Sequence, residues 1–221
     1  MTSRSTLDDP RVKSTLDHMF AQAERDDTDT WQAAAHRPPG SEPTTAQERA
    51  DLAAGLYLPI SAEGGRLLYT LIRAVRPRTV VEFGMSFGIS TLHLAAAVRD
   101  NGLGRVITTE LSASKIAAAR QTFAETGLDD VITILEGDAC ETLPAHLDTG
   151  VDFVLLDGWK YLYLPVLHLL EPHLAPGTLV IADDVEMKIV QPYLAYIRDP
   201  ENGYQGVTFT VEDGMEVSCR L

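Results

Sequence analysis

Residues 79–98 read TVVEFGMSFGISTLHLAAAV, and this stretch decides the fold. Its first five residues, TVVEF, are mostly apolar and β-branched, which is typical of a strand buried on both faces of a parallel sheet. Gly84 and Gly88 then allow a sharp turn, because glycine adopts backbone conformations that other residues avoid. The remaining residues, ISTLHLAAAV, have the composition of a helix. The stretch therefore predicts a strand, a turn and a helix in succession, which is the repeating unit of α/β proteins.

The same alternation of strands and helices continues to the C-terminal region. Further strands are expected at residues 105–110, 131–137, 151–157 and 178–184. Helices are expected at residues 65–75 and 112–127, in a short segment after residue 137, between the fourth strand and about His173, and near residues 187–198. The end of the chain differs, because GVTFTV and MEVSCRL are separated by a turn with Asp213 and Gly214, which predicts an antiparallel hairpin. These units predict a doubly wound, Rossmann-like α/β fold with helices on both faces of the sheet.

The N-terminal quarter of the chain has a different composition from the rest. Residues 1–37 have the apolar spacing of one or two helices, which we expect to lie outside the main core. Residues 36–48 are rich in proline, glycine, serine and threonine and are interpreted as a linker. The prediction is thus an N-terminal helical extension and linker at residues 1–54, followed by the main domain at residues 55–221.

Charge and cysteine content exclude several classes of function. Acidic residues outnumber basic ones by 32 to 18, so the formal net charge of −14 argues against nucleic acid or an anionic membrane as a partner. The two cysteines have no metal-ligand spacing, and no stretch has the roughly 18 consecutive apolar residues that a transmembrane helix needs. We expect a cytoplasmic protein.

Acidic residues follow almost every predicted strand. The strand ends carry Glu82, Glu110, Asp138, Asp157 and the pair Asp183 and Asp184. In an open α/β sheet, ligands bind beyond the carboxyl ends of the strands, so this acidic edge is a candidate site. The alternative is a solvated acidic edge without function.

The first turn indicates which ligand the sheet binds. A dinucleotide fold would have G-x-G-x-x-G, whereas Gly84 and Gly88 give G-x-x-x-G with a serine at position 86. Glu110 still ends the second strand, where a carboxylate can accept hydrogen bonds from ribose hydroxyls. A ligand with an adenosine but no pyrophosphate, such as S-adenosylmethionine, fits both observations. The alternative for the glycines is close packing of a helix on a strand.

From residue 55 onward the chain resembles class I S-adenosylmethionine-dependent methyltransferases. The resemblance implies a seven-stranded sheet of order 3-2-1-4-5-7-6, with one antiparallel strand from the final hairpin. It places one set of residues at the methionine end of the cofactor, namely Glu82, Gly84, Gly88 and Ser90. It assigns Glu110 to the ribose and Asp138 and Ala139 to the adenine. It also places Ile60 and Ser61, in the segment before the first helix of the domain, near the cofactor.

Three carboxylates are expected to meet beside the cofactor. In that strand order, Asp157 ends the fourth strand, and Asp183 and Asp184 end its neighbour about 4.8 Å away. A divalent cation would remove the repulsion between them and gain hard oxygen ligands. Successive strand residues point to opposite faces, so Asp183 and Asp184 can both bind an ion only where the strand has become a loop.

Residues 155–185, LLDGWKYLYLPVLHLLEPHLAPGTLVIADDV, are similar to catechol O-methyltransferase and its metal-dependent bacterial relatives. The resemblance implies that Asp157, Asp183 and Asp184 bind Mg²⁺, or another divalent cation such as Mn²⁺ or Ca²⁺. It also implies that Asp157 and Trp159 contact the cofactor and that Lys160, with Asp157, is catalytic, Lys160 as the base. Asp184 replaces the usual asparagine of the family, and Glu201 is a candidate for its further acidic contact to substrate.

These observations predict a divalent-metal-dependent O-methyltransferase for a small hydroxylated acceptor, such as a catechol-like compound. Two alternatives stay open: a metal-independent methyltransferase acting on a hydroxyl or amine, and a protein that binds S-adenosylmethionine without catalysis. The resemblance also implies a homodimer.

Overall fold

The computed structural model describes residues 5–35, 45–147, 150–211 and 213–221, with only the backbone described for residues 26–35. Most of the predicted linker, at residues 36–44, lies outside the described residues.

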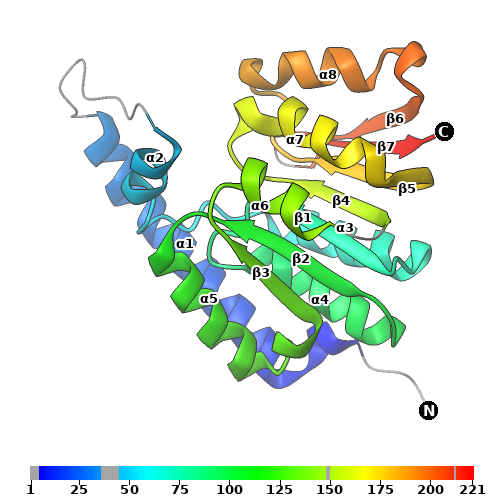
Figure 1. Cartoon of the computed structure of the whole chain (residues 1–221). Helices are drawn as coiled ribbons and strands as arrows, with labels where there is room; N and C mark the ends of the chain where they lie inside the picture. The colour runs from blue at the N-terminus through cyan, green and yellow to red at the C-terminus, as the bar shows by residue number, and fades with distance from the viewer. Residues whose placement is uncertain (1–4, 36–44, 148–149, 212) are drawn as a thin grey trace.

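In the described part of the chain, seven strands form one sheet of order β3-β2-β1-β4-β5-β7-β6 (Figure 1). The strands are β1 (Thr79–Phe83), β2 (Arg105–Glu110), β3 (Ile132–Glu136), β4 (Val151–Leu156), β5 (Leu174–Ala182), β6 (Tyr204–Phe209) and β7 (Met215–Arg220). The first five run parallel, and β7 pairs antiparallel with both β5 and β6. The predicted strand order and the closing hairpin are confirmed.

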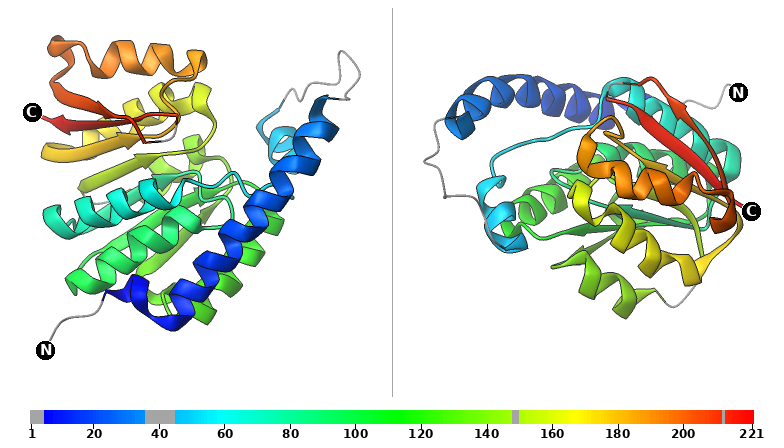
Figure 2. Two further views of the ribbon diagram at one scale, coloured as in Figure 1. Left: turned by 180° about the vertical axis from the view of Figure 1, so that it is seen from behind. Right: turned by 90° about the horizontal axis from the view of Figure 1, so that it is seen from above.

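Helices cover both faces of the sheet (Figure 2). One face carries α3 (Ala62–Val75), α4 (Ile89–Asn101) and α5 (Ala113–Thr126), and the other carries α6 (Ala139–His146), α7 (Tyr163–Leu170) and α8 (Gln191–Ile197). Short 3₁₀ helices lie between these elements: η2 (Asp129–Val131), η3 (Lys160–Leu162), η4 (Glu171–His173), η5 (Lys188–Val190) and η6 (Pro200–Asn202).

Alternate residues of each central strand enter different hydrophobic cores. Val80 of β1 packs in the core beneath α3, α4 and α5, whereas Val81 packs in the core beneath α6, α7 and α8. The same division separates Phe153 from Val154 in β4. Burial on both faces explains why these strands are apolar without alternation.

The N-terminal segment is part of the main core. It forms η1 (Thr6–Asp8) and α1 (Pro10–Ala35), and α1 contacts α4 and α5. Val12, Leu16 and Met19 are buried in the same hydrophobic core as α4 and α5. The expectation that this segment lies outside the core is therefore wrong for residues 5–25, because its apolar face completes the covering of α5. The division at residue 54 stays a prediction.

A second N-terminal helix, α2 (Ala46–Leu52), begins with a capping box. The Thr45 hydroxyl accepts from the Glu48 N–H, and the Glu48 carboxylate accepts from the Thr45 N–H. These two bonds fix the start of α2 where the described chain resumes, and α2 leads into residues 53–61 before α3.

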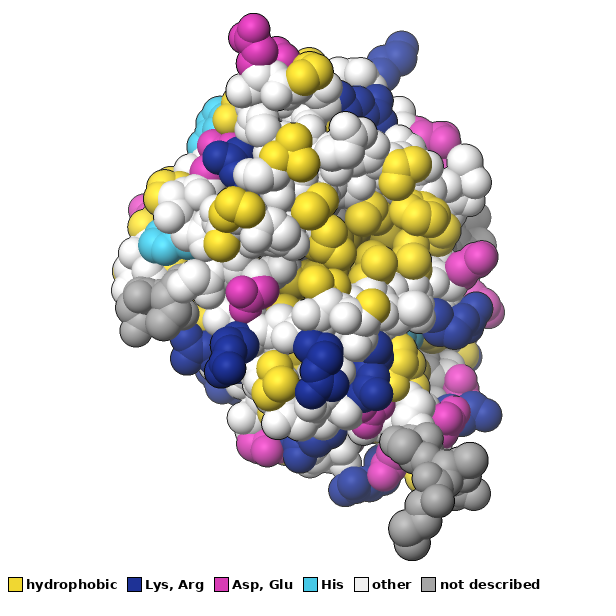
Figure 3. Space-filling view, turned by 90° about the vertical axis from the view of Figure 1, so that its right-hand side faces the viewer, with side chains coloured by type: hydrophobic (Ala, Val, Ile, Leu, Met, Phe, Trp, Pro, Cys, Tyr) yellow, Lys and Arg dark blue, Asp and Glu magenta, His cyan; other side chains and the backbone are white. Residues whose placement is uncertain are grey.

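Figure 3 shows hydrophobic side chains gathered on one face, with lysine and arginine side chains below them. The exposed large hydrophobic residues of the protein include Val75 of α3 and Val207 and Phe209 of β6.

Within the described residues, no helix combines the length and apolar character needed to cross a lipid bilayer. The homodimer stays a prediction.

Candidate active site

A cavity of about 490 Å³ lies at the carboxyl ends of the strands. Its walls come from the turns that follow β1 to β5, from α2 and from residues 57–60. Such an edge is where ligands bind in open α/β sheets, since the loops diverge there.

The turn after β1 requires glycine at position 84. Gly84 has a φ of +100°, and a Cβ atom there would lie 2.5 Å from the Cα atom of Gly158. Ser86 also adopts a positive φ of 51°. Gly88 also has a positive φ, of 95°, and a Cβ atom there would lie 2.7 Å from the ring of Phe123. Gly88 does not line the cavity.

Glu82 is fully buried below this turn. One carboxylate oxygen accepts hydrogen bonds from the hydroxyls of Thr91 and Thr108, and the other has no partner. Burial raises the pKa of Glu82 to about 7, although the neighbouring hydroxyls of Ser90, Thr108 and Thr91 favour the charged form. Ser90 itself lines the cavity. A buried carboxylate oxygen without a donor fits the ammonium group of an amino-acid ligand.

Glu110 lies at the end of β2 and lines the cavity. Its Oε1 atom accepts from the backbone N–H groups of Leu111 and Ser112, and its Oε2 atom accepts from that of Ser86, each at 2.8 Å. Asp138 caps α6 by accepting from the Cys140 N–H at 2.8 Å. Asp138 and Ala139 also line the cavity.

Asp157, Asp183 and Asp184 converge as the sequence predicts. One carboxylate oxygen from each lies within 4.8 Å of the others. β5 ends at Ala182, and Asp184 has a φ of 55°, so the chain has left the extended conformation and both aspartates can face one point. Burial and the carboxylates of Asp157 and Asp184 raise the pKa of Asp183 to about 8.

Lys160 places its ammonium among these carboxylates. Its Nζ atom lies 3.1 Å from Asp157 Oδ1 and 2.7 Å from Asp184 Oδ2, and it donates to the Tyr163 hydroxyl at 2.8 Å. Burial would lower the pKa of Lys160, but the carboxylates of Asp157 and Asp184 outweigh burial and hold this pKa well above its usual value. The cluster thus attracts positive charge, and its hard oxygen donors fit Mg²⁺, Mn²⁺ or Ca²⁺.

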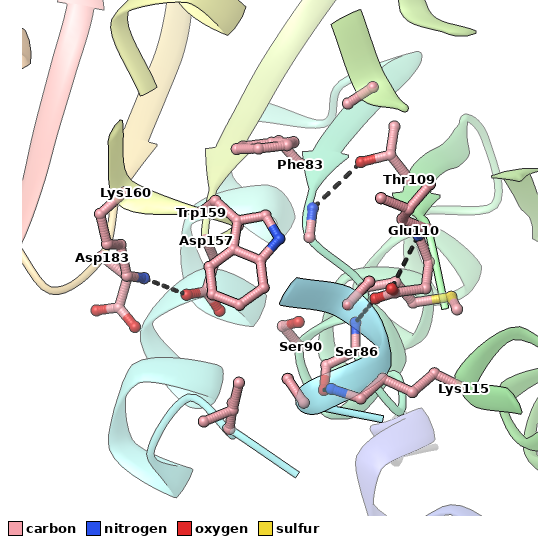
Figure 4. Close-up of a pocket in the computed structure, with 18 of the residues that line it drawn as sticks. Phe83, Ser86, Ser90, Thr109, Glu110, Lys115, Asp157, Trp159, Lys160 and Asp183 are labelled. Atoms are coloured by element: carbon pink, nitrogen blue, oxygen red, sulfur yellow. Dashed lines mark hydrogen bonds and ion pairs between the residues drawn. The ribbon is translucent and has the colours of Figure 1, made fainter. Parts of the chain in front are cut away.

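The structure brings most of the predicted site residues to this one cavity (Figure 4). They are Ile60, Gly84, Ser90, Glu110, Asp138, Ala139, Asp157, Trp159, Lys160, Asp183 and Asp184. Ser61, Glu82 and Gly88 are not among the lining residues. Ser61 instead caps α3 by accepting from the Gly64 N–H at 3.0 Å. Glu201 is exposed in η6 and does not line the cavity either.

Several lining residues have no counterpart among the predictions. They include Ala46, Ala50, Ala53, Tyr57, Leu58, Phe83, Lys115, Met187 and Asp213. The three alanines recur with helical spacing, which could have indicated a small-residue face on α2. Lys115 lies in the first turn of α5, and only its position after Glu110 could have suggested a role.

Comparison with known proteins agrees with this geometry. A family model described as a methyltransferase domain matches residues 81–185. Catechol O-methyltransferase B of Danio rerio is 31% identical over 73% of this chain and 65% of its own length, just under two thirds. Catechol O-methyltransferase of Sus scrofa is 31% identical over 63% of this chain and 77% of its own length. An O-methyltransferase from Bacillus cereus, solved with S-adenosylhomocysteine, has a TM-score of 0.68 at 20% identity and covers 94% of this chain and 91% of its own.

The fold and the site define a class I, Rossmann-like methyltransferase. More narrowly, the chain belongs to the O-methyltransferase family that includes catechol O-methyltransferase.

Proposed function

We propose that the protein is a divalent-metal-dependent O-methyltransferase that transfers the methyl group of S-adenosylmethionine to a hydroxyl of a small acceptor. The observation that carries the proposal is that one cavity contains both the carboxylate cluster and the acidic residues that fit the cofactor. Asp157 belongs to both groups, because it is one of the three carboxylates and follows β4 next to the glycine turn.

The cofactor site is supported by the polar groups around the turn. The Ser90 hydroxyl, which lines the cavity, and the unpartnered oxygen of Glu82, which is buried next to the lining, fit the methionine end. Glu110 fits the ribose. Asp138 and Ala139 fit the adenine, and the half-buried Trp159 forms a wall beside Asp157. S-adenosylmethionine supplies an electrophilic methyl group, which is transferred in one displacement.

The metal site is supported by the donor set of Asp157, Asp183 and Asp184. When bound there, a divalent cation supplies positive charge that lowers the pKa of an acceptor hydroxyl and orients it. Asp184 adds a negative charge where the resembled family has a neutral asparagine, and this charge favours a hard cation.

Lys160 is the proposed proton acceptor. The acceptor oxygen forms a bond to the methyl carbon while the bond from that carbon to sulfur breaks, and the hydroxyl proton passes to Lys160 Nζ. To accept it, Lys160 must first be neutral, which requires that Asp157 and Asp184 have another positive partner. Nζ lies 2.7 Å from Asp184 Oδ2, so it is close enough to reach a hydroxyl held at the carboxylate cluster.

The acceptor end of the cavity is mostly apolar. Its lining contains Leu162, Met187, two alanines of α2 (Ala46 and Ala50) and Ala53, which caps the C-terminus of α2. This combination suits a small acceptor with an apolar ring and vicinal hydroxyls that face the carboxylates. Met187 is exposed, so the cavity can admit such a compound from solvent.

One observation favours the metal-independent alternative. Lys160 already neutralises part of the cluster through its contacts with Asp157 and Asp184. In that case the three acids would serve the cofactor and a hydroxyl or amine substrate directly. The non-catalytic alternative would give cofactor binding without turnover.

The test is methyl transfer from S-adenosylmethionine to a panel of catechols, single phenols and amines, followed by mass spectrometry. We expect product with vicinal hydroxyls, loss of product in a chelator and recovery with Mg²⁺ or Mn²⁺. Lys160→Met should reduce kcat by at least about 100-fold, within the range of a lost general base. Lys13→Met, an exposed lysine on α1, is the matched control. Full turnover in the chelator would contradict the metal-dependent proposal and favour the alternative.

A further inference from the structure

Lys115 is a buried lysine in the wall of the cavity. It lies in the first turn of α5, the residue is 4% exposed, and it lines the cavity with Glu110 and Ser86. Figure 4 shows its side chain extending from α5 toward Ser86. Lysine is seldom buried to this degree without charged or polar partners, so the position requires an explanation.

The contacts of Lys115 use only part of the hydrogen-bonding capacity of its ammonium group. Lys115 Nζ donates to Ser86 Oγ at 3.0 Å and lies 5.3 Å from the centre of the Phe87 ring. The Ser86 hydroxyl donates a hydrogen bond to the Tyr57 carbonyl at 2.6 Å, so its oxygen acts as the acceptor for Lys115. An ammonium has three N–H donors, and one of them is used by Ser86. Because Lys115 lines the cavity, a ligand oxygen can accept hydrogen bonds from its other two N–H groups.

The hydrogen bonds of Glu110 limit what this carboxylate can do alone. A carboxylate has about four acceptor positions, and three are used by the N–H groups of Ser86, Leu111 and Ser112. One position is left for a ligand. A second polar group beside Glu110 would therefore add to its contact with the ribose.

From these two observations we infer that Lys115 is a second ribose contact of the cofactor. Glu110 accepts the hydrogen of one ribose hydroxyl, and Lys115 donates to the oxygen of the neighbouring hydroxyl. The inference rests on the proposed function, because it requires an adenosyl ligand in this cavity. Burial lowers the pKa of Lys115 while the Glu110 carboxylate raises it, which is consistent with two groups that face the same ligand.

A purely structural role for Lys115 is the competing explanation. The chain of hydrogen bonds from Lys115 through Ser86 to Tyr57 also connects α5 to the segment before α3. In that case Lys115 would hold the turn in place and would not distinguish one ribose from another. A comparison of ligands that differ only in a hydroxyl separates the two roles.

The experiment is calorimetric titration of S-adenosylhomocysteine and its 2′-deoxy and 3′-deoxy analogues into wild type, Lys115→Met, Ser86→Ala and Lys13→Met. Methionine keeps the aliphatic packing over Phe87 and removes the donors. We expect Lys115→Met to weaken S-adenosylhomocysteine binding about tenfold or more, as for a hydrogen bond to a charged group. For one deoxy analogue, wild type and Lys115→Met should bind within about twofold of each other, whereas the other analogue keeps the full loss. Lys13→Met should bind all three ligands like wild type.

An equal loss for all three ligands, reproduced by Ser86→Ala, would overturn the inference in favour of the structural role, as would unchanged binding in Lys115→Met. If Lys115→Met does not fold, as judged by thermal unfolding, Lys115→Gln replaces it and should show the same dependence on one hydroxyl at a smaller loss. Failure of the wild type to bind S-adenosylhomocysteine at all would overturn the proposed function together with this inference.

Discussion

Lys160 Nζ lies 2.7 Å from Asp184 Oδ2, so a lysine ammonium stands among the carboxylates that are proposed to hold a divalent cation. The same ammonium is 3.1 Å from Asp157. Lysine and a cation therefore compete for the same oxygens, and this competition can be measured.

Replacing Lys160 with methionine should lower the stability of the protein in the absence of metal. It should also make the stability depend on a divalent cation. Three carboxylates would lose their counter-ion, at a cost of about 2 kcal/mol, less than for a fully buried pair because the side chains are partly exposed. Millimolar Mg²⁺ should restore the loss, as measured by chemical denaturation with and without the ion. An unchanged free energy of unfolding in Lys160→Met, relative to Lys13→Met, would contradict this reading of the cluster.

Asp184→Asn should weaken divalent cation binding while leaving cofactor binding intact. The substitution keeps the side-chain size and an oxygen ligand, and asparagine tolerates the positive φ of 55° at this position. It removes one negative charge, so we expect a tenfold or greater rise in the Kd for Mn²⁺ by calorimetry. Asp17→Asn, an exposed aspartate on α1, is the matched control. Equal Mn²⁺ affinity in both variants would exclude Asp184 from the metal site.

Binding of the cofactor product should release a proton near pH 6. Glu82 has a pKa of about 7 in the folded protein, raised from 4.5 by burial, so at pH 6 it is mostly neutral. The ammonium of S-adenosylhomocysteine favours its charged form, and the proton is then released. Calorimetry in two buffers of different ionisation enthalpy should detect the release of nearly one proton per ligand bound to the wild type. The Glu82→Gln variant should lack this proton release. Identical proton release in both proteins would show that Glu82 does not face the ligand ammonium.

The pKa of Glu82 also sets the sign of a stability effect. Because the folded value is above the unfolded value, the fold favours the neutral form. The contribution of Glu82 to stability is fully present below pH 4.5 and is lost as the pH rises through about 7. Without ligand, Glu82→Gln should therefore gain stability relative to wild type between pH 5 and pH 8 in denaturation series. A constant difference over that pH range would contradict the raised pKa.

Substitutions at Gly158 and Phe83 should have non-additive effects on the stability of the protein. A Cβ atom at position 158 would lie 2.6 Å from the Phe83 ring, so Gly158→Ala should cost about 1–3 kcal/mol in stability, as expected for overpacking. Phe83→Leu removes the ring and should recover most of this loss in the double variant. Additive losses in thermal or chemical unfolding would show that the two residues do not share this space.

The sequence predicts much of this fold because burial on both faces leaves a clear pattern in the strands. β1 begins and ends where TVVEF does, and the order of the sheet follows from the resemblance. The position of α1 was not predictable in the same way, since its periodicity shows an apolar face but not the surface that covers it. Val12, Leu16 and Met19 could equally have faced another helix or a partner.

The candidate site also contains residues that the sequence predicts and residues that it does not. The acids at strand ends were predictable because parallel strands place their carboxyl ends at one edge, and Asp157 and Asp183 follow from this rule. The lining from α2 and the buried Lys115 were not, because they depend on how distant segments pack. Gly88, a predicted cofactor residue, does not line the cavity, and its positive φ and close approach to Phe123 both favour glycine there.

The proposed metal site is tested most directly by anomalous diffraction from crystals that contain both Mn²⁺ and S-adenosylhomocysteine. We expect one strong Mn²⁺ peak bounded by the carboxylates of Asp157, Asp183 and Asp184, with Lys160 moved away from Asp184. Density for the ligand without an anomalous peak, and with Lys160 still bonded to Asp157 and Asp184 at saturating Mn²⁺, would contradict the proposed metal site.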